Sequence, residues 1–336
     1  MKRILVVNVN WLGDAIMTTP AFKAIKEKFP SSFVAVTAPE RVKEVFSDNP
    51  HIDEVIIFDE KKNQKAFSQK LRFIQQLRAK KFDTAFLIHR SFTRALICLL
   101  SGIKVRIGYR RLKNIFIVNK MINPPAKNIH KQDYYLYLFE KAAIAIADKL
   151  PKVYIQQQIQ EKYKADISII RQKHTYLVGV NPSANWLLKQ WPQENFAILC
   201  DKLIRELNCG ILFIGAKIDT AIVDGVINKM VGDAYNFCAK TNIKELAAII
   251  KNVDLFISND SGPAHLSASL GVNTLVLFGP TSSKLSAPRG KAVQILEKSI
   301  HCEIPCYSTS CQDNLCIKNI TVEDAYIKAK EFLKNV

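Results

Sequence analysis

The sequence predicts an α/β protein with two domains, each a doubly wound parallel sheet. The chain has 336 residues, which is long for a single core and comfortable for two domains of roughly 150 residues each. Short apolar runs alternate with helix-length amphipathic segments along the whole chain. Apolar residues make up 48% of the composition and charged residues 23%, so the chain can bury a core and does not have the composition of a disordered protein.

The first half contains four short apolar runs typical of strands, at residues 4–9, 33–37, 55–58 and 85–88. Amphipathic segments predict helices between them, including 14–29 and 67–80. Strands that are apolar on both faces and separated by helices favour a parallel sheet covered on both sides.

The second half repeats this rhythm, with strands expected at residues 177–180, 211–214, 255–258 and 274–278 and helices at 195–207 and 243–251. A final helix is expected at 321–334, with Thr321 as its N-cap and Asp324 three residues later. The boundary between the two domains is expected within residues 150–175, where Leu150-Pro151 precedes a polar run. We therefore expect domains at 1–170 and 171–320, followed by a C-terminal helix at 321–336.

The chain contains no segment typical of secretion or membrane insertion. The N-terminal apolar run is too short for a signal peptide, and no run approaches the roughly 18 apolar residues that a membrane span needs. Four cysteines stand singly in apolar segments, as expected in a reducing compartment. These are Cys98, Cys200, Cys209 and Cys238. We expect a cytoplasmic protein, soluble or peripheral.

Positive charge is concentrated in the first half. The net charge is +18, and residues 1–150 hold 27 Lys or Arg against 13 acids, compared with 21 against 17 in the remainder. Between Asp83 and Asp133 there are ten basic residues and no acid. This window is either a solvated basic face or a docking site for an anionic partner.

The first motif is the run from Asn10 to Ala15, Asn-Trp-Leu-Gly-Asp-Ala, between the first strand and the first helix. Ligands of parallel sheets bind at the carboxyl ends of the strands, so Asp14 could accept a proton there from a sugar hydroxyl. It could equally be an N-cap. A Gly-x-Gly-x-x-Gly dinucleotide fingerprint is absent.

The second motif, residues 181–192, follows the first strand of the second half. Lys189 is either a solvated loop lysine or a cation held for a diphosphate by the small-residue turn before it and Trp191-Pro192 after it.

The third and strongest motif, residues 258–266, reads Ser-Asn-Asp-Ser-Gly-Pro-Ala-His-Leu and opens a helix expected to run to Leu270. Free amides and the helix dipole make such a terminus an anion site, although a plain Asp or Ser cap would look the same. His265 could be an ordinary core histidine. The turn at residues 278–282 follows the next strand and could close the same pocket.

Taken together, these segments resemble glycosyltransferase family 9, the ADP-heptose:lipopolysaccharide heptosyltransferases, and the type II members more than type I. The resemblance is carried by ordered motifs between residue 4 and about residue 290: residues 11–14, 91–96, 102–110, 189–192, 259–262 with His265, and 279–281.

The resemblance implies a GT-B fold, in which two Rossmann-like domains face a cleft, and inverting transfer of L-glycero-D-manno-heptose from ADP-heptose to the inner core of lipopolysaccharide. Asp14 would be the catalytic base, and Lys189, also counted as catalytic, would hold the diphosphate. The implied donor-binding residues are Ser183, Lys189, Asp260, Ser261, Gly262, His265 and Thr281. The candidate acceptor-binding residues are Gly13, Arg90, Arg94, Arg106, Arg110 and Arg111, chosen from the basic window and the family placement.

Fixed positive charge on the leaving phosphates could replace a metal ion, and the chain has no Asp-x-Asp motif. We therefore expect no cofactor and no metal. The expected partners are the nucleotide-sugar donor, the phosphorylated core acceptor and the anionic inner face of the inner membrane, to which the protein would bind peripherally. A nucleic-acid partner is not expected.

Four cysteines cluster near the C-terminus: Cys302, Cys306, Cys311 and Cys316. Their spacing lacks the Cys-x-x-Cys pairs usual for zinc. Metal binding, redox pairing and unligated thiols all remain open.

Three other functions remain in competition. The chain could be a family 9 enzyme for another nucleotide sugar or glycan, a basic nucleic-acid-binding protein, or a glycan-binding homologue without catalysis. The basic window lacks interleaved aromatic stacking residues, and nucleic-acid binding would leave the candidate phosphate loop without a purpose.

Overall fold

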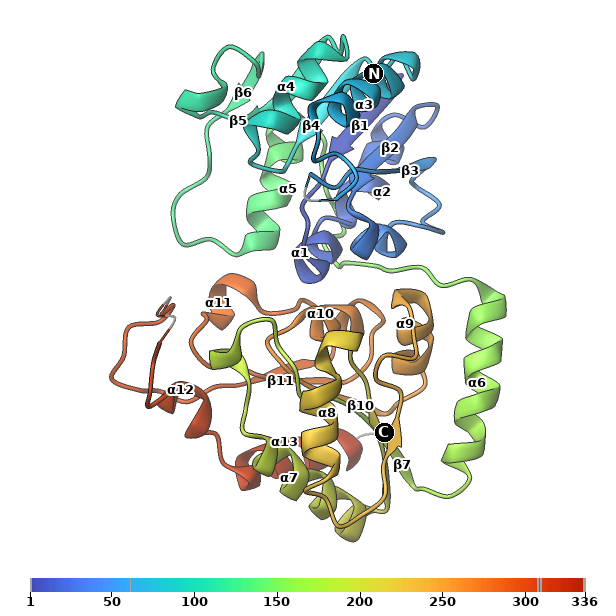
Figure 1. The fold of residues 1–336 in the computed structure, drawn as a ribbon, viewed down its shortest axis with the longest axis vertical. Helices are drawn as coiled ribbons and strands as arrows, with labels where there is room; N and C mark the ends of the chain where they lie inside the picture. The colour runs from blue at the N-terminus through green and yellow to red at the C-terminus, as the bar shows by residue number, and fades with distance from the viewer. Residues whose placement is uncertain (1, 61, 307, 309, 335–336) are drawn as a thin grey trace. The chain divides into compact units, whose positions relative to one another are not determined.

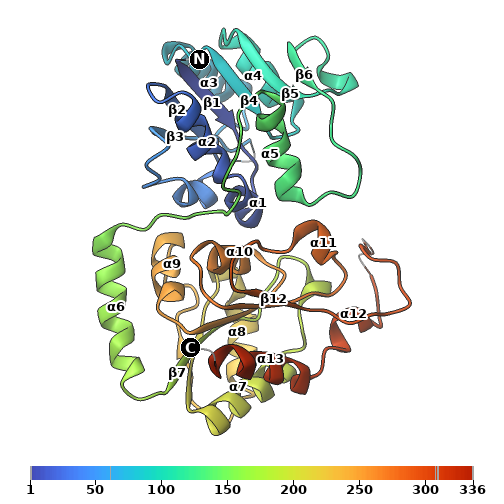
Figure 2. The ribbon, with the colours of Figure 1, turned by 180° about the vertical axis from the view of Figure 1, so that it is seen from behind.

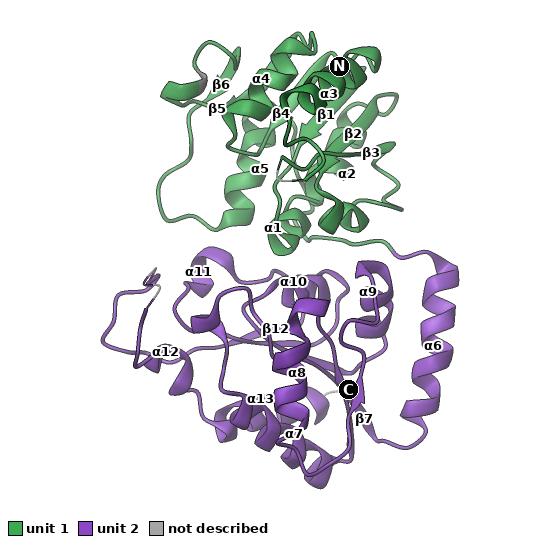
Figure 3. Ribbon diagram, in the orientation of Figure 1, with its two compact units in different colours: residues 1–154 green, residues 155–336 purple. Residues whose placement is uncertain are grey.

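The computed structural model describes residues 2–60, 62–306, 308 and 310–334. The chain forms two compact units, residues 1–154 and residues 155–336 (Figure 3). Each unit is a six-stranded, all-parallel sheet with helices on both faces (Figures 1 and 2). The predicted α/β class with two doubly wound sheets is confirmed.

The sheet of unit 1 has the strand order β3-β2-β1-β4-β5-β6. Its elements are β1 (Arg3–Val7), α1 (Leu12–Met17), α2 (Pro20–Lys28), β2 (Phe33–Ala38), η1 (Glu40–Val45), β3 (Glu54–Ile57), α3 (Phe67–Ala79), β4 (Thr84–Leu87), α4 (Phe92–Leu100), β5 (Val105–Tyr109), η2 (Leu112–Asn114), β6 (Lys120–Ile122) and α5 (Lys131–Lys141).

Successive side chains of each strand point to opposite faces of the unit 1 sheet, and both faces are apolar. Leu5 and Val7 of β1 join a buried cluster with side chains of α3 and α4. On β4, Ala85 and Leu87 point to this same cluster, whereas Phe86 stacks on Phe139 of α5 with ring centroids 4.7 Å apart. Helices α3 and α4 therefore cover one face, and α5 covers the other.

The helix expected over residues 14–29 is two helices in the structure. Helix α1 ends at Met17 and α2 begins at Pro20. Proline has no N–H to continue a helix, but it fits the first helical position, so Pro20 starts a new helix.

The sheet of unit 2 has the strand order β12-β11-β10-β7-β8-β9. Its elements are α6 (Gln157–Arg171), β7 (Tyr176–Asn181), η3 (Leu187–Lys189), α7 (Gln193–Leu207), β8 (Cys209–Phe213), η4 (Lys217–Asp219), α8 (Thr220–Ile227), β9 (Tyr235–Asn236), α9 (Ile243–Lys251), β10 (Leu255–Asn259), α10 (Gly262–Ser269), β11 (Thr274–Leu277), α11 (Ser283–Ser286), β12 (Val293–Leu296), α12 (Leu315–Lys318) and α13 (Val322–Lys334).

The polar segment after Leu150-Pro151 belongs to unit 2. It folds as helix α6, which packs on α9.

The last helix has the expected N-cap: Asp324 N donates to Thr321 Oγ1 (3.1 Å) and Thr321 N donates to Asp324 Oδ2 (2.9 Å). Lys298 and Thr321 contact this carboxylate and lower the pKa of Asp324 to about 2.

In both sheets the strand order reverses beside the first strand of the unit. The reversal lies between β1 and β4 in unit 1 and between β7 and β10 in unit 2. Parallel α/β sheets bind ligands outside the carboxyl ends of the strands at such a point. A ligand site is therefore expected at the loops that follow these four strands.

Candidate active site

Asp14 lies in the first turn of α1, directly beyond the carboxyl end of β1. The N-cap position is occupied by Trp11, so Asp14 is not the cap of this helix. Its carboxylate accepts a hydrogen bond from the Tyr135 hydroxyl and lies 3.9 Å from Lys131 Nζ. About a sixth of the side chain is exposed (17%). The carboxylate is thus oriented by α5 and remains accessible.

Tyr135 and Lys131 are one turn apart on α5, so both reach the same carboxylate. Burial raises the pKa of the Tyr135 hydroxyl well above its usual value, and the charge of Asp14 raises it further. The phenol therefore stays protonated at neutral pH and can only donate to Asp14.

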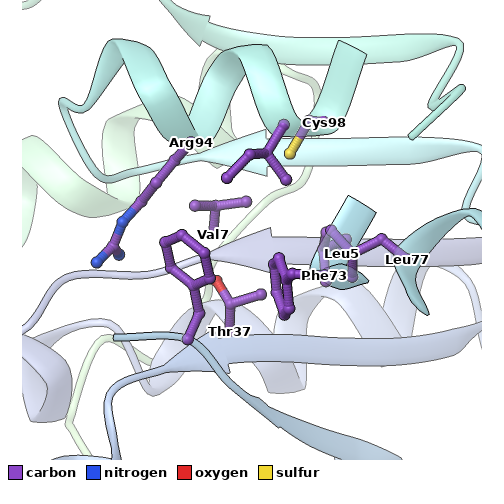
Figure 4. Close-up of a pocket in the computed structure, with 9 residues that line it drawn as sticks. Leu5, Val7, Thr37, Phe73, Leu77, Arg94 and Cys98 are labelled. Atoms are coloured by element: carbon purple, nitrogen blue, oxygen red, sulfur yellow. The ribbon is translucent and has the colours of Figure 1, made fainter. Parts of the chain in front are cut away.

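Arg94 holds the loop between β1 and α1. Its side chain is 3% exposed. The guanidinium donates to Asn8 O (2.9 Å), to Asn10 Oδ1 (2.9 Å) and to Glu60 Oε2 (3.2 Å). Figure 4 shows its aliphatic part lining a small apolar pocket with Val7. This interior position differs from the acceptor contact expected from the sequence, because the fork of donors is already engaged within the protein.

His89 follows β4, on the other side of the strand-order reversal, and its Nε2 lies 3.1 Å from Asn10 Nδ2. Burial, and then the charge of Arg94, lower the pKa of His89 to about 4. The imidazole is therefore neutral at pH 7.

The remaining candidate acceptor residues lie in different environments. Arg106 is buried and donates to carbonyls of its own segment, including Ile117 O at 2.6 Å, so it too has a structural position that differs from the expected one. Arg90 is exposed and lies 4.7 Å over the Tyr134 ring. Arg110 is exposed and Arg111 is half-buried. Gly13 lies in the first turn of α1 beside Asp14.

In unit 2, three predicted donor residues from three different loops lie together. Lys189 Nζ lies 2.5 Å from Asp260 Oδ2, and Thr281 Oγ1 donates to the same oxygen at 2.7 Å. Asp260 is 6% exposed, whereas the lysine side chain is 21% exposed. A lysine ammonium has three N–H donors, so Lys189 keeps donors for an anionic ligand while paired with Asp260.

Buried amide and hydroxyl groups fix these loops in place. Asn259 accepts from Trp191 N (3.1 Å) and donates to Pro182 O (2.7 Å), which ties the loops after β7 and β10 together. Ser261 Oγ donates to Asn181 Oδ1 at 3.2 Å. Ser183 does not join the Lys189 cluster and instead donates to Asp219.

Helix α10 begins at Gly262, with Ser261 at the N-cap position. The Ser261 side chain makes no capping hydrogen bond to the helix, so it does not cover the first amides. Pro263 leaves the N-terminus without one amide donor, but those of Gly262 and Ala264 remain. His265 is buried one turn further in. Free amides at a helix N-terminus favour an anion.

The four clustered cysteines differ in exposure. Cys302 and Cys311 are exposed, Cys306 is half-buried and Cys316 is buried, and all four are free thiols in the structure. Among the residues that the structure describes, no group of three or more His, Cys, Asp or Glu side chains is arranged to hold a metal ion. Within the same residues, no helix is both long and apolar enough to cross a bilayer.

From the sequence, no role is assigned to Tyr135 or His89, and Asn10 is included only as the start of the first motif, yet all three contact Asp14 or support its loop. Tyr135 lies in a helix whose apolar and polar residues show little segregation, and no local motif marks it. Asn10 and His89 lie in the loops that follow β1 and β4, and this position after a strand is the sequence signal that could have identified them.

Two doubly wound parallel units, each with polar groups at its strand-order reversal, form the architecture of the GT-B fold class. The model of glycosyltransferase family 9 (heptosyltransferase) matches residues 70–316. The chain belongs to this family.

The chain is also similar to individual heptosyltransferases. Lipooligosaccharide heptosyltransferase 2 of Campylobacter jejuni is 28% identical over 333 residues, covering 97% of this chain and 96% of the relative. Lipopolysaccharide heptosyltransferase 2 of Salmonella typhimurium is 25% identical over 306 residues, covering 88% and 87%. The solved structure of E. coli ADP-heptose lps heptosyltransferase II matches with a TM-score of 0.82 at 20% identity, covering 100% of this chain and 99% of that one. The structural match shows the same fold.

Proposed function

We propose that this glycosyltransferase moves L-glycero-D-manno-heptose from ADP-heptose to the inner core of lipopolysaccharide, with inversion and without a metal ion. The observation that carries the proposal is Asp14, an accessible carboxylate held by Tyr135 beyond the first strand of a family 9 chain. The full-length similarity to heptosyltransferases 2 supports the choice of sugar and acceptor.

In the proposed reaction, Asp14 accepts the proton of an acceptor hydroxyl as its oxygen attacks the anomeric carbon of the donor. One bond forms to that carbon while the bond to the phosphate oxygen breaks, so the configuration inverts. ADP leaves with the electron pair. A carboxylate oriented in advance by the Tyr135 donor is a suitable base, because it needs little reorganisation when the proton moves.

Unit 2 would bind the donor. Lys189, Thr281 and the first amides of α10 supply fixed positive potential for the diphosphate. These groups stabilise the charge that develops on the leaving phosphate, which is the task that a metal ion performs in other transferases. Asp260 would hold Lys189 in place, and His265 and Ser261 would shape the nucleotide pocket.

Unit 1 would bind the acceptor. The exposed Arg90 and Arg110, with the half-buried Arg111, offer cations to the phosphates and acidic sugars of the core. Arg94 and Arg106 would support this site from the interior. Because the acceptor is a lipid, the protein would act on the cytoplasmic face of the inner membrane, bound peripherally.

A donor panel tests the proposal. The protein is incubated with a heptosylated core acceptor and, in separate reactions, ADP-heptose, ADP-glucose and UDP-glucose, and the products are weighed by mass spectrometry. A gain of one heptose only with ADP-heptose is expected. Transfer of a hexose without transfer of heptose would contradict the proposed donor, and absence of any product would contradict the enzyme assignment for this acceptor.

A further inference from the structure

One edge of unit 1 exposes large apolar side chains that no part of the described chain covers. Phe92 and Leu100 of α4 are 48% and 45% exposed. In the loop between β5 and β6, Leu112 and Phe116 are 92% and 95% exposed, and Ile115 is 37% exposed. Helix α4 packs against η2, the first part of this loop. We call these five side chains the α4–η2 surface.

The outer side of α4 is apolar for a reason visible in its sequence. Phe92 and Leu100 are eight residues apart and lie on the same side of the helix. The only charged residue of the helix, Arg94, points inward and is buried. A surface helix normally presents charged or polar residues to water, so α4 has the character of a helix that meets an apolar environment on its outer side.

Basic residues lie close in sequence to this apolar surface. Lys104, Arg110, Lys113 and Lys120 are exposed in and beside the same loop. No acid occurs between Asp83 and Asp133, so this segment contains no acidic side chain of its own to neutralise them. Figures 1 and 2 both show β5, β6 and the connection between them at the same edge of unit 1 as α4.

We propose that the α4–η2 surface is where the protein docks on an anionic lipid bilayer, with Leu112 and Phe116 inserted among the lipids and the surrounding lysines and arginines on the headgroups. The inference deepens the proposed function, because a lipid-linked acceptor requires the protein to work at such a bilayer. A segment that combines exposed apolar side chains with exposed Lys and Arg has the composition that binds the interface of an anionic membrane.

A second copy of this chain fits the surface less well. A two-fold contact would place the same cationic loop opposite itself, and like charges at an interface are unfavourable. Leu112 and Phe116 also protrude almost fully exposed rather than lining a groove, which suits insertion into a fluid layer.

Vesicle flotation tests the proposal directly. The protein is mixed with vesicles of phosphatidylcholine alone, or of equal parts phosphatidylcholine and phosphatidylglycerol. We expect wild type to float with the anionic vesicles only, and less so at high salt, because screening weakens the contribution of the lysines and arginines. Absence of flotation with the anionic vesicles would overturn the proposal.

The decisive variant is Leu112→Ser with Phe116→Ser, which changes two side chains that are 92% and 95% exposed. We expect its partition onto anionic vesicles to fall about tenfold or more. The matched control is Ile218→Ser with Val231→Ser, two side chains of unit 2 that are 85% and 95% exposed, and it should bind like wild type. Equal binding by all three proteins would overturn the proposal. So would a wild-type dimer that this double variant converts to monomers, because the surface would then be a self-association interface.

Activity separates this inference from the proposed function. With a water-soluble, delipidated acceptor, Leu112→Ser with Phe116→Ser should transfer heptose at the wild-type rate, and with acceptor embedded in vesicles it should be slower. If wild type transferred no heptose to either acceptor while flotation still depended on Leu112 and Phe116, the proposed function would fail and the docking surface would stand.

Discussion

Lys189 Nζ lies 2.5 Å from Asp260 Oδ2, and the two residues come from loops that follow different strands of the unit 2 sheet. The aspartate is almost fully buried and accepts a second hydrogen bond, from Thr281. The pair therefore fixes the direction of the lysine while its remaining N–H donors stay free for a ligand.

Replacing Lys189 by Ala should lower heptose transfer by roughly 10²-fold, because a fixed charge on the leaving diphosphate is lost. It should also cost about 1–2 kcal/mol of unfolding free energy: among the described residues, Asp260 would stay buried with Thr281 as its remaining side-chain partner, and the loss is limited because the lysine is partly solvated. Steady-state kinetics and urea unfolding measure the two effects. Lys217→Ala, an exposed lysine of the same unit, is the control. Wild-type transfer by Lys189→Ala would remove the lysine from the donor site.

Tyr135→Phe should lower kcat by about tenfold and leave the donor KM unchanged, because Asp14 loses the hydrogen bond that orients it while the donor site in unit 2 is untouched. The control is Tyr137→Phe on the same helix, whose ring contacts Lys141 rather than Asp14. Steady-state kinetics of the two variants measure the effect. Equal kcat values for the two variants would show that the tyrosine does not orient the base.

Variants of Arg94 and Arg110 should distinguish an arginine that stabilises the fold from one that binds the acceptor. Arg94→Leu leaves Asn8 O and Asn10 Oδ1 without their donor and Glu60 without its ion pair, and should destabilise the protein by about 2–4 kcal/mol. Arg110→Ala, at an exposed position, should change stability by less than about 0.5 kcal/mol and raise the acceptor KM. Urea titration and acceptor kinetics test the two variants together. An unchanged acceptor KM in Arg110→Ala would exclude that arginine from the acceptor site.

His89 should make the protein less stable in mild acid. Its pKa is about 4 in the folded chain against an ordinary 6.5, so the unfolded chain binds the extra proton between these pH values. Its contribution is therefore complete above pH 6.5 and is lost as pH falls toward 4, by up to about 3 kcal/mol. His89→Asn, which does not titrate, should show a flatter dependence of unfolding free energy on pH in this window. A parallel dependence in both proteins would show that other groups dominate.

Metal removal should leave the reaction intact. We expect the same transfer rate before and after dialysis against EDTA, because the proposed positive charge on the diphosphate comes from Lys189 and amide donors. Elemental analysis of the purified protein examines the four C-terminal cysteines separately. Loss of activity on chelation that a specific metal restores would contradict the metal-independent mechanism.

The α/β architecture was predictable from the sequence because strands buried on both faces are continuous apolar runs between amphipathic helices. The strands β5, β6, β9 and β12 were not recognised. Val105–Tyr109 contains an arginine that is buried only because neighbouring carbonyls accept its donors, and Lys120–Ile122 is a short edge strand. Burial of such an arginine within a strand depends on tertiary contacts, which the spacing of apolar residues in the sequence does not reveal.

The candidate site was predictable to the extent that its residues follow strands. Lys189, Asp260 and Thr281 all do, and the structure brings them together. Charge alone could not separate Arg94 and Arg106 from the exposed arginines of the same window, because burial of an arginine depends on partners distant in sequence, such as Asn8 and Glu60. Tyr135 was missed for the same reason, since its partner Asp14 lies on another helix.

The most direct test of the central claim is the rate of heptose transfer by Asp14→Asn at saturating ADP-heptose and acceptor. Asparagine keeps the size of the side chain but cannot accept the hydroxyl proton as a carboxylate does. A fall of roughly 10²–10⁴-fold in kcat, with the fold retained by circular dichroism, is the predicted result. A kcat equal to that of wild type would show that Asp14 is not the base.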